Sequence, residues 1–139
     1  MLLSKEAWGP TFWAFIHTIA ETYIRTDIRY ESYLSFFLSL HHMLPCPQCA
    51  KHYHDYLTKP GVYMALKSSL AADDGKQLRE WVIELHNHVN AETDKPILSQ
   101  KDALDAHAAL IDPDNKSGGV PFAVIAFFLV LVFLFFFYK

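Results

Sequence analysis

The two cysteines of this chain stand together as Cys46-Pro47-Gln48-Cys49, and the sequence contains no other cysteine. Two thiols at this spacing can form a disulfide with each other without a partner elsewhere in the chain. In a cytosolic protein such a pair is more often catalytic or metal-binding than structural, because glutathione and thioredoxin keep ordinary disulfides reduced. The motif therefore predicts thiol oxidation chemistry, with metal binding as the competing interpretation.

Three structural interpretations of the pair compete. Prolines on both sides of Cys46 favour its placement at the start of a helix, where free amide donors and the helix dipole stabilise a thiolate. A zinc site would combine Cys46 and Cys49 with His52 and His54, but residues 52 and 54 of one helix point about 200° apart. A thioredoxin-like fold would need a strand before the motif, and the preceding segment has helical spacing. Redox chemistry is the favoured interpretation, and zinc binding stays open.

Tryptophan and histidine recur at helical spacing on both sides of the cysteines. Trp13 and His17 are four residues apart, and so are His86 and Asn90, so each pair shares one helix face. Trp81 precedes the second pair on the same predicted helix. Each of these residues alone is more often a core tryptophan or a satisfied histidine, but together they indicate a surface that holds a flat redox cofactor beside the cysteines.

The apolar residues that must position these groups recur every three or four positions through residues 1–111, which is typical of amphipathic helices. No stretch alternates with period two for long enough to predict a sheet, so the predicted fold class is all-α, and a small helical bundle is its simplest form. Five helices are predicted, and they cover residues 8–19, 33–44, 46–59, 78–89 and 99–110, the last beginning at a Ser99–Asp102 capping box.

The stretch from Val120 to Tyr138 contains no charged residue. As a helix it would span roughly 29 Å, close to the ~30 Å hydrocarbon core of a bilayer. A buried core helix is the alternative, but continuous Phe, Leu, Val and Ile leave no polar face to meet water. We therefore predict a transmembrane tail anchor at residues 120–138, a linker at residues 112–119 and one globular domain at residues 1–111.

The position of the predicted span also predicts where the domain resides. Only Lys139 follows the span, so membrane insertion would occur after translation and leave the globular domain in the cytosol. The first residues carry Lys5 and Glu6 and lack the continuous apolar core of a signal peptide. We expect a single-pass membrane protein whose domain faces the cytosol.

Taken together, the cysteines, tryptophans and histidines resemble the Erv/ALR family of FAD-linked sulfhydryl oxidases. The resemblance covers residues 8–98, and the small size and lack of further cysteines make the chain most similar to the family members of large cytoplasmic DNA viruses. The ordered residues that carry it are Trp8-Gly9-Pro10, Trp13-x-x-x-His17, Tyr23, Cys46-x-x-Cys49-x-x-His52, Trp81, His86-Asn87-x-Val89-Asn90 and Lys95.

The resemblance implies a four-helix bundle with a short fifth helix that holds FAD noncovalently. It implies that Cys46 exchanges disulfides with the substrate, that Cys49 faces the flavin, and that the electrons pass to oxygen and give hydrogen peroxide. Flat side chains suit stacking on the cofactor's rings, and a lysine suits its phosphates. The residues implied to contact FAD are Gly9, Thr11, Phe12, Trp13, His17, Tyr23, His52, Trp81, His86, Asn87, Val89, Asn90 and Lys95.

The resemblance also implies partners. Cellular members of the family commonly add a second cysteine pair on a flexible tail, and this chain has none. A dithiol protein must therefore reach the Cys46–Cys49 disulfide directly, and we expect a small thioredoxin-like or Cys-x-x-x-Cys viral protein that docks beside Pro47. A homodimer is implied as well. The anchor would hold the oxidase at host membranes of viral assembly or in the virion membrane, where it would form disulfides in virion proteins.

Two other classes of protein stay as alternatives. A tail-anchored zinc-binding adaptor would use Cys46, Cys49 and either His52 or His54 as ligands, with the tryptophans as core residues. A purely structural membrane protein would bind a partner through its helical domain and would be indifferent to the loss of both cysteines. No nucleic-acid partner is expected, because the net charge is −3 at pH 7 and no Lys/Arg run is present.

Overall fold

A computed structural model describes residues 4–111 of the chain, and every regular element in that range is helical. The predicted all-α class is confirmed. None of the helices within residues 4–111 is long and apolar enough to cross a membrane, and the predicted linker and tail anchor lie outside the described residues. The helices are α1 (Lys5–Glu21), α2 (Asp27–Ser39), the short 3-10 helix η1 (Leu40–His42), α3 (Pro47–Leu57), α4 (Val62–Ala71), α5 (Lys76–Ala91) and α6 (Gln100–Ile111).

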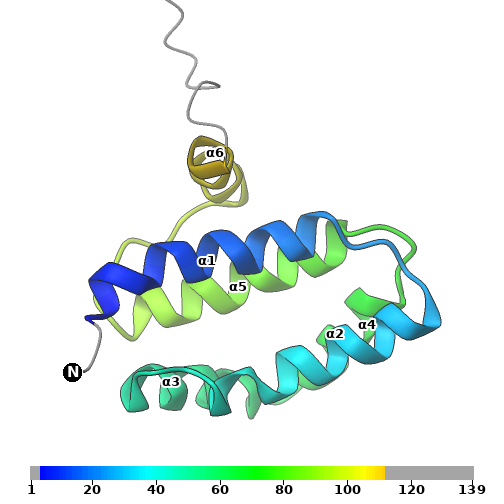
Figure 1. Ribbon diagram of the computed structural model, residues 1–139, viewed down its shortest axis with the longest axis horizontal. Coiled ribbons are helices and arrows are strands. Elements are labelled where there is room, and N and C mark those ends of the chain that lie inside the picture. Colours follow the sequence, from blue (N-terminus) through cyan, green and yellow to red (C-terminus); the bar gives the residue numbers. More distant parts are fainter. Residues whose placement is uncertain (1–3, 112–139) are drawn as a thin grey trace, which may run out of the picture. The chain divides into compact units, whose positions relative to one another are not determined.

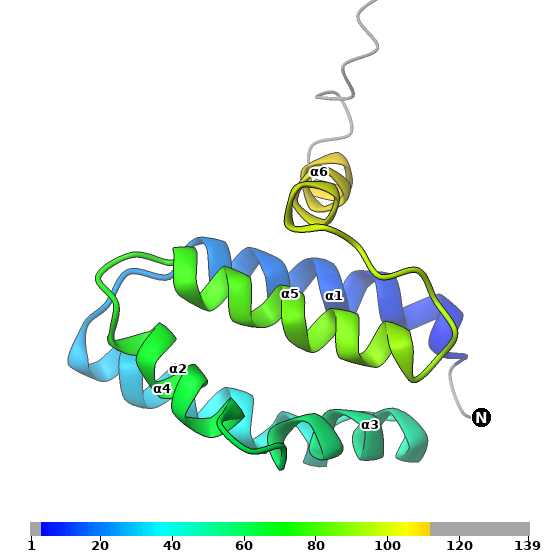
Figure 2. The same ribbon diagram turned by 180° about the vertical axis from the view of Figure 1, so that it is seen from behind.

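The helices α1 and α5 lie side by side in one layer, and α2, α3 and α4 form a second layer (Figures 1 and 2). The helices α1 and α5 run antiparallel, as the ion pair between Glu21 near the end of α1 and Arg79 near the start of α5 shows. Since α5 also packs on α3 and α4, it is the central helix of the bundle. The largest fully buried side chains between the layers are Tyr23, Tyr53, Phe37, Ile16, Leu66, Leu70, Leu78, Leu85 and Val82.

The predicted number of helices was wrong, because α4 was not predicted. It is only 10 residues long and begins at Val62, after the N-cap Gly61, which adopts a left-handed conformation with φ of 85°. A helix this short draws its stability from tertiary packing rather than from local propensity. Leu66 and Leu70 supply that packing, and both are completely buried.

The predicted second helix also ends earlier than expected. The α-helical hydrogen bonding of α2 stops at Ser39, and η1 follows as one tight turn instead of a continuation to Leu44. A residue that precedes a proline is disfavoured in the α conformation, so Pro45 prevents helix at Leu44. The break leaves a short non-helical link, residues 43–45, that leads into the cysteine motif.

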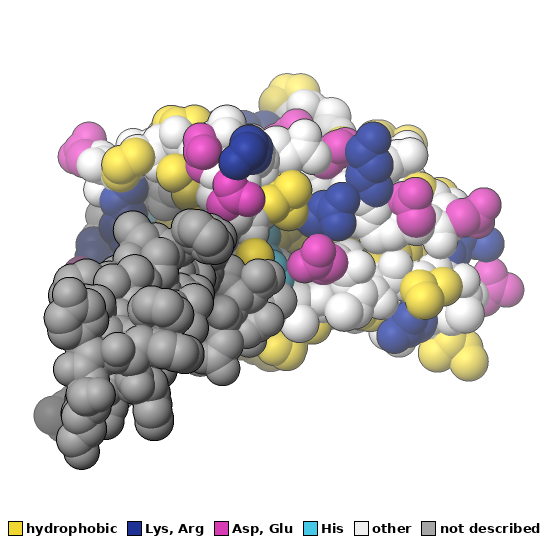
Figure 3. All heavy atoms as spheres, turned by 90° about the horizontal axis from the view of Figure 1, so that it is seen from above, with side chains coloured by type: hydrophobic (Ala, Val, Ile, Leu, Met, Phe, Trp, Pro, Cys, Tyr) yellow, Lys and Arg dark blue, Asp and Glu magenta, His cyan; other side chains and the backbone are white. Residues whose placement is uncertain are grey.

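The surface of the domain carries both signs of charge. On the face drawn in Figure 3, lysine and arginine side chains are interspersed with aspartate and glutamate and with apolar side chains. No continuous basic surface appears on that face.

Candidate redox and cofactor site

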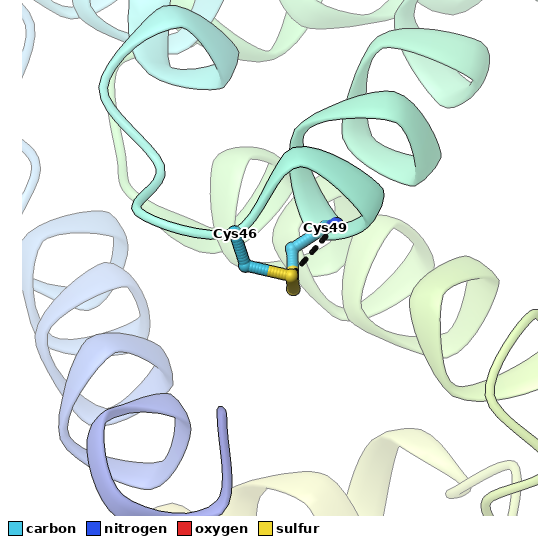
Figure 4. Close-up of a disulfide and its surroundings, with 2 residues drawn as sticks. All are labelled: Cys46 and Cys49. Carbon is cyan, nitrogen blue, oxygen red and sulfur yellow. Dashed lines mark hydrogen bonds between the residues drawn. A yellow bond between two sulfur atoms is a disulfide. The ribbon is translucent and has the colours of Figure 1, made fainter. Parts of the chain in front are cut away.

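The two cysteines form a disulfide at the start of α3 (Figure 4). Cys46 is the N-cap residue of this helix, and its sulfur accepts a hydrogen bond from the backbone N–H of Cys49 at 3.2 Å. Pro47 occupies the first turn, where its missing N–H is not needed and its fixed φ suits the helix. After reduction, this amide and the helix dipole would stabilise negative charge on the Cys46 sulfur. The predicted placement of the motif at a helix start is confirmed.

The two histidines that follow the motif point to different sides of α3. His52 is buried at 9% exposure, whereas His54 is exposed. Both cysteine sulfurs are bonded to each other, so neither is a free thiolate in this state. Within residues 4–111 no group of three or more His, Cys, Asp or Glu side chains is arranged to hold a metal ion.

Trp13, His17 and His86 form a single cluster between α1 and α5. The indole of Trp13 and the imidazole of His86 stack with ring centroids 3.8 Å apart and planes 7° apart. The Nε2 atom of His17 lies 3.0 Å from Nδ1 of His86, which is a hydrogen-bond distance. The structure thus brings together three of the residues predicted for the cofactor site, from segments about 70 residues apart in sequence.

Burial keeps both histidines of this cluster neutral at pH 7. Desolvation, with a smaller effect of His107, lowers the pKa of His17 to about 4. Desolvation, followed by the charges of His17 and Lys95, lowers the pKa of His86 to about 3. Because a neutral imidazole has one donor and one acceptor nitrogen, one ring donates and the other accepts in the His17–His86 hydrogen bond.

The start of α1 supplies the next part of the predicted site. Phe12 packs edge-on against Trp8 and Trp13, with centroids 5.6 and 5.5 Å away. Gly9 is partly buried, yet a Cβ added there would meet no atom within 4 Å. The indole Nε1 of Trp8 is buried and has no hydrogen-bond partner. Thr11 is exposed on the same helix.

The end of α5 and the loop that follows it carry Asn87, Val89, Asn90 and Lys95. Asn87 clamps the loop, since its Nδ2 donates to the carbonyl of Leu98 at 2.8 Å and its Oδ1 accepts from the Leu98 N–H at 3.0 Å. The Nδ2 of Asn90 donates to the Pro96 carbonyl at 3.1 Å.

These bonds hold the loop against α5. The Asn90 carbonyl accepts from the Lys95 N–H at 2.9 Å. The Lys95 side chain is exposed and close enough to affect the pKa of His86. Val89 is partly buried on the same helix.

Two of the predicted cofactor residues belong to the hydrophobic core. Tyr23 is 1% exposed, and its hydroxyl donates to the Leu70 carbonyl at 2.7 Å. Trp81 is 3% exposed and packs edge-on against Phe37 and Tyr56, with centroids 5.3 and 5.7 Å away. The ring of Tyr23 therefore has no open face for a cofactor, while the buried Nε1 of Trp81 has no hydrogen-bond partner.

Sequence reasoning missed His107, which lies on α6 and is 4% exposed. Its ring is 5.5 Å from that of His17, measured between centroids. An isolated histidine among alanines has no spacing pattern that points to a site, so only the contacts of His107 with α1 reveal it.

These features suit a flat cofactor with acceptor atoms. The Trp13–His86 stack offers a planar polar surface, the open side of Gly9 offers room, and the unpartnered N–H of Trp8 offers a donor. A surface of this kind in an all-helical bundle that also carries a Cys-x-x-Cys disulfide is typical of a helical thiol–disulfide redox protein.

Comparison with known proteins agrees, and the chain belongs to the Erv1/Alr family, whose family model matches residues 10–108. A probable FAD-linked sulfhydryl oxidase of Acanthamoeba polyphaga mimivirus is 32% identical over 117 residues, which cover 83% of this chain and 78% of the relative. An FAD-linked sulfhydryl oxidase of African swine fever virus is 31% identical over 94 residues, which cover 66% of this chain and 72% of the relative. The FAD-linked sulfhydryl oxidase ERV1 of Arabidopsis thaliana is 25% identical over 117 residues, which cover 83% of this chain and 56% of the relative. The resemblance inferred from the sequence is confirmed.

Proposed function

We propose that this chain is an FAD-dependent thiol oxidase that forms disulfide bonds in protein dithiols and passes the electrons through flavin to oxygen, with hydrogen peroxide as product. The observation that carries the proposal is the Cys46–Cys49 disulfide at the N-terminus of α3 in a chain of the Erv1/Alr family. The names of the viral relatives support the cofactor and the reaction class.

The disulfide performs the exchange in two steps. A substrate thiolate attacks the sulfur of Cys46, forms a mixed disulfide with it and releases Cys49 as a thiolate. The second substrate thiolate then attacks the substrate sulfur of the mixed disulfide and releases Cys46. The N-cap position of Cys46 favours this second step, because the amide of Cys49 and the helix dipole stabilise the departing thiolate. The substrate leaves as a disulfide, and both electrons remain on the cysteine pair.

FAD, when bound, takes these two electrons from the cysteine pair and delivers them to oxygen. The chain's own residues would bind and orient it. Trp13 and His86 would present a stacking surface, His17 would fix the His86 ring, and Lys95 would attract the phosphates. The proposed cofactor-site residues are the thirteen named from the resemblance, among which Tyr23 and Trp81 belong to the core and would support the site from there.

The protein substrate would reach the disulfide directly. Cys46 is partly exposed between the exposed Pro45 and Pro47, and Met43 is 60% exposed nearby in the chain. A small thioredoxin-like or Cys-x-x-x-Cys protein could present a thiol there, whereas a large folded substrate would be sterically hindered. The catalytic unit would be a homodimer.

The cellular role is inferred from the predicted anchor and from the viral relatives. Residues 120–138 would hold the oxidase in host membranes of viral assembly or in the virion membrane, with residues 1–111 facing the cytosol. There it would form disulfides in virion proteins within an otherwise reducing compartment.

The first experiment is an absorbance spectrum of the full-length chain purified in detergent, repeated after dithiothreitol is added in air. We expect a yellow protein with oxidised-flavin bands that bleach with thiol and recover as oxygen is consumed and hydrogen peroxide appears. A colourless protein that carries zinc would overturn the oxidase proposal and favour the adaptor.

The membrane assignment has its own test. The full-length chain and a variant that ends at residue 119 are expressed in parallel, and membranes are washed with alkaline carbonate. The full-length chain should stay in the membrane pellet with its domain open to added protease, and the shortened variant should be released. Release of both proteins, or protection of the domain from protease, would contradict the proposed topology.

A further inference from the structure

His107 approaches α1 with both nitrogens of its ring. Its Nε2 atom lies 3.0 Å from Oγ1 of Thr18 and 3.2 Å from the carbonyl oxygen of Ala14. Its Nδ1 atom lies 3.4 Å from a carboxylate oxygen of Glu21. The side chain is 4% exposed. All three partners are on α1, so this one residue of α6 spans two turns of that helix.

The groups around the His107 ring are acceptors. A backbone carbonyl and a carboxylate can only accept hydrogen bonds. The hydroxyl of Thr18 donates its own hydrogen to the Ala14 carbonyl at 2.8 Å, so it too meets the His107 ring as an acceptor. Removal of the ring would take this partner away from the part-buried Thr18 hydroxyl and Ala14 carbonyl, which costs free energy. The contact therefore attaches His107 to α1.

The attachment lies next to the candidate site. His107 contacts residues that flank His17 on α1, and the His17 and His107 rings are 5.5 Å apart with planes tilted by 41°. His17 in turn bonds to His86 at 3.0 Å. His17 is only 6% exposed, and α6 covers it through His107.

We propose that His107 is a positioning residue for the His17–His86 pair. It holds α6 on the face of α1 that carries His17, excludes water from the His17 ring and keeps that ring in place to bond with His86. This inference depends on the proposed function in one respect: the His17–His86 pair would serve to support the flavin.

The test measures the His17 ring itself in the full-length chain in detergent. Isotope-labelled histidine gives one set of ring signals for each of the eight histidines, and the signals of residue 17 are assigned by their loss in His17→Gln. The variant His107→Leu has an apolar side chain of similar size but makes none of the three polar contacts with α1. We expect the pKa of His17 to rise by more than about one unit, because water reaches the ring and the coulombic effect of His107 on it is lost. The spin coupling across the hydrogen bond between the His17 and His86 rings should disappear.

Two further variants keep the test decisive if His107→Leu does not fold. His107→Gln retains a donor near the position of Nε2, which faces Thr18 and Ala14, and should restore most of the wild-type His17 signal. His107→Asn retains a donor near Nδ1, which faces Glu21, and should restore less. His54→Gln, a change of an exposed histidine on α3, is the matched control and should leave residue 17 unaffected.

A folded His107→Leu or His107→Asn protein in which the pKa of His17 and its coupling to His86 are unchanged would overturn the proposal, even if its melting temperature fell. Flavin content is measured separately by absorbance. A protein without flavin that still shows the His107 effect on His17 would count against the proposed function alone. A flavin-bound protein without that effect would count against the positioning role alone.

Discussion

The indole of Trp13 and the imidazole of His86 stack with centroids 3.8 Å apart, and this contact joins α1 to α5. The same imidazole bonds to His17. One ring of α5 is therefore held by two residues of α1, by stacking on one and by a hydrogen bond to the other. Such a ring is fixed before any cofactor binds.

The two contacts of His86 can be separated by substitution. His86→Phe keeps a flat ring for stacking on Trp13 but loses the bond to His17, and we expect about 10-fold weaker flavin binding. His86→Leu loses both contacts, and we expect on the order of 100-fold weaker binding. Flavin titration of the flavin-depleted proteins measures both values. Equal affinities for the two variants would contradict a role for the stack, and His42→Phe, a change of an exposed histidine of η1, is the control.

Both cysteines should be required for activity, but the absorbance spectra of the two single-cysteine variants should differ. Cys46→Ser and Cys49→Ser should each lower thiol oxidation by on the order of 100-fold or more, because neither can form the disulfide. If Cys49 faces the flavin, the Cys46→Ser protein retains that thiolate and should show a long-wavelength absorbance that depends on pH. The Cys49→Ser protein should lack it. The opposite pattern would exchange the proposed roles of the two cysteines.

A substitution at Gly9 should affect the stability of the fold and the binding of the cofactor in opposite directions. A methyl group at this helical position meets no atom within 4 Å, so Gly9→Ala should raise the free energy of unfolding by about 0.5–1 kcal/mol. If the flavin occupies the open side of Gly9, the same methyl group should weaken flavin binding. Denaturant unfolding and flavin titration measure the two effects, and unchanged flavin affinity would remove Gly9 from the site.

Gly75 provides the contrasting glycine. A Cβ there would lie 2.6 Å from the carbonyl oxygen of Ala20 and 3.1 Å from that of Tyr23, which are backbone atoms that cannot move aside easily. We expect Gly75→Ala to lower the free energy of unfolding by about 1–3 kcal/mol. The two glycine variants should therefore shift the denaturant midpoint in opposite directions.

Acid should destabilise the fold through His17 and His86. Their pKa values of about 4 and about 3 lie below the value of 6.5 for an unfolded histidine. Between these values the unfolded state binds more protons, so the stabilisation is complete above pH 6.5 and is lost as the pH falls toward 4. We expect wild type to lose on the order of 3 kcal/mol more than His17→Gln between pH 7 and pH 4. Parallel denaturant curves at several pH values test this, and identical pH dependence in the two proteins would contradict it.

Most of what was predicted correctly depends on residues close together in sequence. The helix start at Cys46 follows from the prolines around it, and the capping box forms as expected, with the Ser99 hydroxyl 2.7 Å from a carboxylate oxygen of Asp102 and accepting from its N–H at 3.2 Å. The shared face of Trp13 and His17 is likewise a consequence of helical spacing. Interactions of this range can be inferred from one sequence because the helix geometry alone sets which residues meet.

The sequence by itself thus determined the all-helical class, the placement of the disulfide at a helix N-terminus and the resemblance to the Erv/ALR family. The tertiary structure decided the existence of α4, the burial of Tyr23 in the core, the stacking of Trp13 on His86 and the attachment of His107 to α1. The physical reason is that His107 and Thr18 are 89 residues apart in the chain, and contacts at such distances arise from how whole helices pack, which no local spacing encodes.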